Sequence, residues 1–204
     1  MLSLLLLPAM LAIPKLAPAP PSLEQAILAE LNFVRAQPRL YAETLRAYRR
    51  YFKGRIVYTP GRPAGIRTAE GVKAVDEAIA FLEGQPVTPP LTAAPLLARA
   101  AGVHVAEQGP GGDTGHRSRD GADPRDRMQR LGGGDYVAET ITYGPDTAAE
   151  VVRQLIVDDA VPTRGHRRTV FAAEMRFAGA RCGPHRVYGT MCVVEYGRTQ
   201  TGQY

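Results

Sequence analysis

The chain has 204 residues, the length of one ordinary domain with at most a short appendage. Hydrophobic residues make up 45% and charged residues 22% of the sequence, and this globular composition excludes a wholly disordered chain. The formal net charge is +5, but the basic residues are scattered and form no dense block, so we expect no nucleic-acid partner.

The N-terminus carries the one long apolar run, which excludes a multi-pass membrane protein. Residues 2–13 read LSLLLLPAMLAI, a stretch too short to span a bilayer as a helix, and a Pro/Ala-rich stretch follows. We interpret residues 1–21 as a secretory signal peptide, with a short N-terminal anchor as the alternative. The sequence therefore predicts a secreted or periplasmic protein with a single domain over residues 22–204.

The first half of that domain is predicted to be helical. Apolar residues recur at the spacing of one helix face in four stretches. These predicted helices cover residues 22–37, 39–52, 70–83 and 95–108. Residues 54–68 are rich in Gly and Pro and predict a loop.

A second long loop is predicted over residues 109–135, which are rich in glycine and charged side chains. Loops of this length are usually functional or disordered. A strand over residues 137–143 and a helix over residues 147–158 follow it. Because the helices come first and the strands come late, the pattern predicts an α+β domain with helices packed on a small sheet.

The chain is predicted to end in a β-hairpin with strands over about residues 176–182 and 188–197. The two cysteines of the sequence, Cys182 and Cys192, lie on its two sides. An antiparallel pair can bring two cysteines close enough for a disulfide, and the alternative is two buried free thiols. The export signal implies an oxidising compartment and favours the disulfide.

Four histidines are the main candidates for chemistry. His104 lies in an apolar helical stretch, where a structural role is expected, and His185 falls in the hairpin turn, where we expect it to be solvated. His116 and His166 share a context, because each follows a glycine and precedes an arginine. Glycine next to histidine allows a tight turn and the close approach of another group.

Carboxylates lie near these two histidines in the sequence. Glu139 sits in the apolar segment VAETITYG, where a carboxylate is costly unless it is paired, and Asp158 and Asp159 end the helix that leads to His166. Two histidines with two acids could bind a divalent metal, act as acid and base on a substrate, or form a hydrogen-bond network that only stabilises the fold. The sequence lacks the H-E-x-x-H, C-x-x-C and G-x-S-x-G motifs, so spacing alone does not decide between these hypotheses.

Several motifs in a fixed order resemble the CAP superfamily of cysteine-rich secretory, antigen 5 and pathogenesis-related 1 proteins, above all its bacterial secreted SCP-domain branch. The resemblance runs from about residue 24 to residue 197. Its motifs are LNFVRAQP, LLARAAGVHVAEQ, GHRSRDG, VAETITYG, LIVDDAVPTRGHRR and MCVVEYG.

The resemblance implies an α-β-α sandwich with a small antiparallel sheet between helical layers. It also implies a cavity formed by His116, Glu139, His166 and a second acid, which is Asp158 or, as the alternative, Asp159. The family's second acid is normally a glutamate, so the shorter aspartate is a departure. Several family members hold zinc or another divalent cation between the two histidines.

The function implied by the resemblance is a non-enzymatic, extracellular binding module. We expect a monomer that binds a lipid or another small ligand, or a surface partner. One alternative is a metal-assisted hydrolase of peptide or cell-wall bonds with Glu139 as the base. Another is a cavity whose residues are purely structural.

Overall fold

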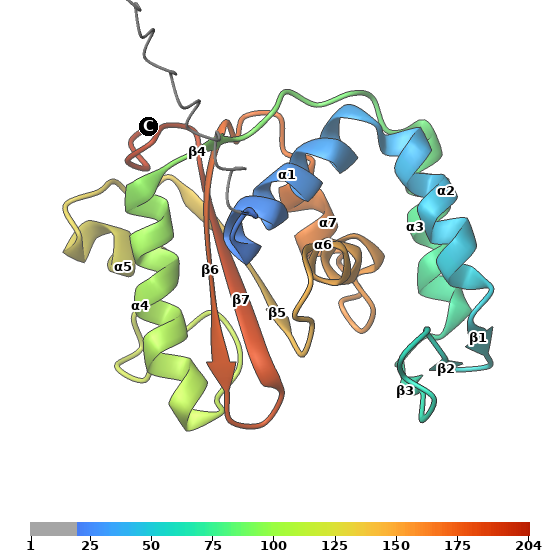
Figure 1. Cartoon of the computed structure of the whole chain (residues 1–204). Helices are drawn as coiled ribbons and strands as arrows, with labels where there is room; N and C mark the ends of the chain where they lie inside the picture. Colours follow the sequence, from blue (N-terminus) through green and yellow to red (C-terminus); the bar gives the residue numbers. More distant parts are fainter. Residues whose placement is uncertain (1–19) are drawn as a thin grey trace, which may run out of the picture.

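A four-stranded sheet between two layers of helices organises the chain in the computed structural model, which describes residues 20–204 (Figure 1). The predicted signal peptide or anchor, residues 1–21, falls almost entirely outside the described residues. Within the described part, none of the helices combines the length and the apolarity that a bilayer crossing requires. The helices are α1 (Leu23–Ala36), α2 (Pro38–Arg49), α3 (Val72–Gly84), α4 (Pro95–Gly111), α5 (Pro124–Arg130), α6 (Ala148–Val157) and α7 (Gly165–Val170). The strands are β1 (Phe52–Lys53), β2 (Ile56–Val57), β3 (Ile66–Arg67), β4 (Thr92–Ala93), β5 (Val137–Tyr143), β6 (Phe177–His185) and β7 (Gly189–Gly197).

The main sheet has the strand order β4-β6-β7-β5. The β6–β7 hairpin lies at its centre, and β5 pairs antiparallel with β7. α4 and α5 lie on one side of the sheet, and α1, α6 and α7 lie on the other, with α2 and α3 beyond them (Figure 1). The predicted α+β class and α-β-α layering are therefore confirmed, with one addition: the two-residue strand β4 pairs parallel to β6.

Side-chain alternation along the strands decides which residues reach each helical layer. Ile141 of β5 packs with Met191 and Val193 of β7 in the cluster that also contains residues of α4. Glu139 lies two residues before Ile141, so it shares this face, and its register partner on β7 is Glu195. Two carboxyl groups thus point from neighbouring strands toward the α4–α5 side.

The first helix is fixed by two polar side chains rather than by packing alone. Asn32 accepts a hydrogen bond from the amide of Leu91 at 2.7 Å and donates to the carbonyl of the same residue at 2.9 Å. Arg35 is fully buried and donates to the carbonyls of Pro89 and Met175 at 2.8 and 3.0 Å. These bonds satisfy the buried guanidinium and tie α1 to the segments that enter β4 and β6.

Two predicted loops contain regular structure. Residues 109–135 are not one long loop, because α4 continues to Gly111 and α5 forms within the stretch. Asp123 begins α5 as its N-cap, with its carboxylate accepting from the amides of Arg125 and Asp126. The predicted loop over residues 54–68 contains β2 and β3, which join β1 in a small three-stranded antiparallel sheet.

The predicted disulfide is present. Cys182 and Cys192 are register partners on β6 and β7, and their sulfur atoms are bonded. Disulfides persist in oxidising compartments, so this bond supports export of the chain from the cytosol.

Candidate functional site

His116 and His166 lie side by side although fifty positions separate them in the sequence. His116 sits in the loop that follows α4, and His166 is the second residue of α7. The centroids of their rings are 6.2 Å apart, and the ring planes are inclined by 51°. The His116 side chain is 49% exposed and the His166 side chain 22% exposed, so the pair is open to solvent.

Each of these histidines rests on a buried carboxylate. His116 Nδ1 lies 2.8 Å from Glu139 Oε1, and His166 Nδ1 lies 2.7 Å from Asp158 Oδ1. A carboxylate only accepts hydrogen bonds, so Nδ1 is the donor in each pair, and Nε2 is the nitrogen that carries the lone pair in the neutral tautomer. The four residues named from the sequence thus come together as two His–carboxylate pairs. Asp159 is not among them, since its carboxylate accepts from the amides of residues 69 and 70.

Two further residues complete the cluster below His116, and the sequence analysis missed both. Arg127 of α5 is 2% exposed, hydrogen-bonds Glu139 Oε2 and donates to the carbonyl of His116 at 2.9 Å. Its Nη2 lies 3.5 Å from Oε1 of the fully buried Glu195. Glu195 interrupts the apolar run MCVVEYG, which is the same signal that singled out Glu139. Arg127 belongs to a short polar helix and carries no such signal.

The two buried glutamates differ in their ionisation. Burial alone would raise the pKa of Glu139, but the hydrogen bond from His116 and the charge of Arg127 outweigh it and hold this pKa below the ordinary value. Burial, together with the negative charge of Glu139, raises the pKa of Glu195 well above the ordinary value. The cluster therefore favours the ionised form of Glu139 and the protonated form of Glu195.

The backbone just before His116 is held by side chains of α4 and β5. The Gly115 amide donates to the hydroxyl of Tyr143 at 2.9 Å. The Gly115 carbonyl lies 2.8 Å from Gln108 Nε2 and 2.9 Å from His104 Nε2. Gly115 has φ +99°, a conformation that favours glycine. His104 is therefore a buried structural residue, as expected.

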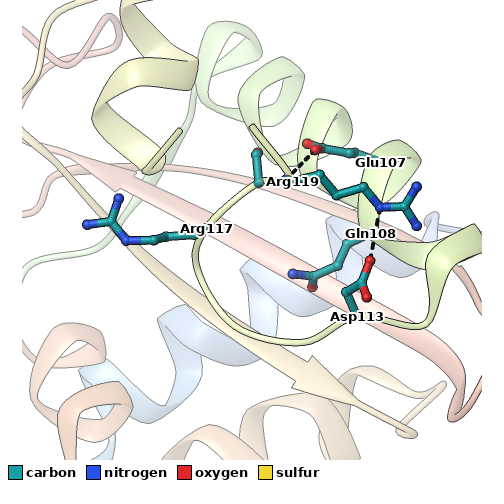
Figure 2. A pocket seen from close by; sticks show the side chains of 6 residues that line it. Glu107, Gln108, Asp113, Arg117 and Arg119 are labelled. Carbon is teal, nitrogen blue, oxygen red and sulfur yellow. Dashed lines mark hydrogen bonds and ion pairs between the residues drawn. The ribbon is translucent and has the colours of Figure 1, made fainter. Parts of the chain in front are cut away.

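The remainder of the loop is anchored at the end of α4. The amide of Arg119 donates to Glu107 at 2.7 Å, and its guanidinium pairs with Asp113 at 3.0 Å (Figure 2). These residues border a hollow of about 510 Å³. Because the Arg119–Asp113 pair is exposed on both sides, it adds little to stability.

His185 does not lie in solvent as expected. It is 2% exposed, and its Nε2 lies 2.9 Å from the carbonyl of Asp113. Its Nδ1 accepts from the amides of Val187 and Tyr188 at the hairpin tip. The strand β6 extends to residue 185, so His185 is buried beneath the hairpin turn. Its hydrogen bonds connect this turn to the loop that precedes His116.

The backbone that presents His166 is unusual. Three non-glycine residues, Asp158, Ala160 and Arg164, adopt positive φ values of 58°, 66° and 52° within seven positions. Such conformations are costly and concentrate at functional sites. The guanidinium of Arg164 holds this stretch by bonding the carboxylates of Glu70 and Glu77 and the carbonyl of Asp158. Arg164 therefore has a structural role, and its side chain is only 11% exposed.

The donor set can be compared with the needs of a divalent metal ion. The described residues contain no group of three or more His, Cys, Asp or Glu side chains placed to hold one ion, so the protein would supply His116 and His166 alone. Zn–N bonds of about 2.0–2.1 Å would set the centroids of two such rings about 5 Å apart. The observed centroid distance is 6.2 Å, about 1 Å longer than this value. The carboxylates on Nδ1 are the partners that metal-binding histidines typically have.

Comparison with known proteins gives partial structural likeness only. No family model and no curated sequence matches the chain. An outer surface protein from Borrelia burgdorferi is similar at 13% identity and a TM-score of 0.45, over 71% of this chain and 97% of that one. An extracellular protein containing an SCP domain from Bacillus anthracis str. Ames is similar at 19% identity and a TM-score of 0.46, over 76% of this chain and 49% of that one. The chain thus spans about half the length of the latter, and neither likeness bears on the chemistry of the site.

Proposed function

We propose that the chain is an exported, monomeric and non-enzymatic binding protein that takes up a divalent cation such as zinc between His116 and His166. One observation carries the proposal: two solvent-accessible imidazoles lie with their ring centroids 6.2 Å apart, and a buried carboxylate holds Nδ1 of each. This leaves two Nε2 lone pairs as ligands. Water, or a small ligand, lipid or surface partner, would complete the coordination of the ion.

The hydrogen bonds between the two histidines and their buried carboxylates support binding more than catalysis. A metal-assisted hydrolase needs a carboxylate that is free to take a proton from the bound water. Both oxygens of Glu139 are already engaged, one by His116 and one by Arg127. We therefore place hydrolysis of peptide or cell-wall bonds second, with Glu139 as the base it would require.

Zinc titration by calorimetry of the purified protein tests the proposal. We expect one ion per chain with a dissociation constant on the order of micromolar, because two protein ligands hold zinc more weakly than the four of a structural site. The double variant His116→Ala, His166→Ala should lose this binding. The control Asp120→Asn removes an exposed carboxylate from the same loop and should leave the affinity unchanged.

Two results would overturn the proposal. Equal zinc binding by the double variant would place the ion elsewhere. If the wild type binds no zinc and the double variant unfolds in metal-free buffer, the cluster is purely structural. His166→Gln, which keeps a polar side chain of similar size, repeats the test if the double variant does not fold.

A further inference from the structure

A groove of about 420 Å³ lies apart from the histidine pair, where the β1–β3 sheet meets the β5–α6 turn and the tip of the β6–β7 hairpin. Figure 1 shows these three features at the same end of the molecule. The lining comes from residues 48–71, from residues 143–159 and from Tyr188. The volume is typical of a pocket for a small organic molecule.

The walls of the groove are aromatic. Tyr48 and Phe52 form one edge-to-face pair with centroids 5.3 Å apart, and Tyr143 and Tyr188 form a second, tilted pair with centroids 5.5 Å apart. Tyr188 is 51% exposed and Ile66 42% exposed at the rim, so much apolar surface remains uncovered. A flat apolar molecule would bury this surface and gain the stacking energy of aromatic pairs.

The charged residues of the groove leave an excess of positive charge. Arg62 and Arg153 share one carboxylate, that of Glu150, at 3.4 and 3.3 Å. Within residues 20–204, Arg67 has no ion pair. Asp159, the other acid of the lining, is already bonded to two backbone amides at 2.7 and 2.8 Å. Three guanidinium groups thus stand against two carboxylates, and one more anion would balance the groove.

We propose that this groove binds an aromatic organic monoanion, with its ring system against Tyr143 and Tyr188 and its carboxylate, phosphate or sulfonate group on Arg62 and Arg67. Planar guanidinium groups bind such oxyanions through paired hydrogen bonds. A neutral aromatic molecule leaves the excess charge unmatched, and an aliphatic anion leaves the rings without a stacking partner. The proposal does not depend on the metal, since neither His116 nor His166 lines the groove.

Two matched fluorescent probes test the charge requirement. Anilinonaphthalene sulfonate carries an aromatic body and one negative charge, and phenylnaphthylamine is its uncharged counterpart. With the folded, EDTA-treated protein, we expect saturable binding of the sulfonate at one site. The affinity for the neutral probe should be lower by at least about tenfold. Dodecanoate should displace the sulfonate poorly. Equal affinity for both probes, or equally effective displacement by dodecanoate, would overturn the proposal.

Substitutions then locate the site. Arg62→Gln with Arg67→Gln should weaken the sulfonate about tenfold and leave the neutral probe unchanged. The control pair Arg99→Gln and Arg125→Gln removes the same charge from positions on α4 and α5, outside the groove. It should leave the affinity for both probes unchanged. Tyr188→Leu keeps an apolar side chain but removes the ring, so it should weaken both probes. An equal loss of sulfonate affinity in the two double arginine variants, or no loss in the Arg62→Gln, Arg67→Gln variant, would show that the probe binds elsewhere. Circular dichroism verifies that each variant is folded.

Discussion

The buried cluster under His116 leads to a testable prediction about how the stability of the protein depends on pH, because burial favours the protonated form of Glu195. Arg127 supplies one positive charge to two carboxyl groups, and all three side chains are at most 1% exposed. With Glu139 ionised, the cluster is neutral only if Glu195 keeps its proton. A second uncompensated charge in this dry environment would be costly, which is why burial and the charge of Glu139 raise the pKa of Glu195.

The sign of the effect on stability follows from linkage. In the unfolded chain a glutamate has a pKa of about 4.3. Above that pH folding must take up a proton at Glu195, so each pH unit lowers the free energy of unfolding by about 1.4 kcal/mol for as long as the folded group stays protonated. Below about pH 4 both states hold the proton and the effect vanishes.

Glu195→Gln removes this proton uptake while keeping the shape of the side chain. We expect the variant to gain stability over the wild type as the pH rises above about 4.3, by about 1.4 kcal/mol per pH unit for as long as the folded Glu195 stays protonated. At pH 4 we expect no gain. Urea unfolding at pH 4, 5, 6 and 7, followed by circular dichroism in metal-free buffer, measures the difference.

Glu139→Gln is the matched control, because it neutralises the ionised member of the same pair. It should lower the free energy of unfolding at pH 7, since Arg127 loses its ionised partner and Glu195 must then ionise in its place. The reasoning would be refuted if Glu195→Gln destabilised the protein at pH 7, or if its effect were the same at every pH.

Three further predictions concern other parts of the fold. Tyr143→Phe removes the hydroxyl that holds the loop before the first histidine, so it should lower the free energy of unfolding by about 1–3 kcal/mol and weaken zinc binding; unchanged calorimetry and unfolding would contradict this role. Replacing Cys182 and Cys192 by serine should lower the free energy of unfolding by about 2–3 kcal/mol, and the difference from wild type should disappear in reductant. The hydrogen bonds from Arg164 lower the pKa of Glu70 to about 2, so this pair stabilises the fold above the unfolded pKa and the contribution is lost as pH falls toward 2. Glu70→Gln should therefore cost about 1 kcal/mol at pH 7 and nothing near pH 2, as measured by urea unfolding.

Elements with a strong local pattern were predictable from the sequence. Helical periodicity placed α1 and α6 to within one or two residues of their ends, and the predicted strand over residues 137–143 coincides with β5. The hairpin pattern also predicted that the two cysteines pair. These features depend on neighbours in the chain, and their signal is therefore present in short stretches of sequence.

Elements defined by distant partners were missed. β4 is two residues long and exists as a strand only because Thr92 pairs with Phe177. β1, β2 and β3 are equally short and stabilise one another. α5 has no long apolar stripe, and its cap at Asp123 and the burial of Met128 define it instead. No local pattern distinguishes such segments from loops.

For the candidate site, the amino-acid sequence was enough to identify the residue types and the motifs that carry them: two histidines in Gly-His-Arg contexts, and acids in or next to apolar segments. The pairing became visible only in the folded chain, with Glu139 behind His116, and Asp158 rather than Asp159 behind His166. Folding also brought Arg127 from α5 against the sheet. The reason is physical, because a backbone turn at positive φ and a strand register fix where a buried carboxylate points, and both are set by contacts between residues far apart in the chain.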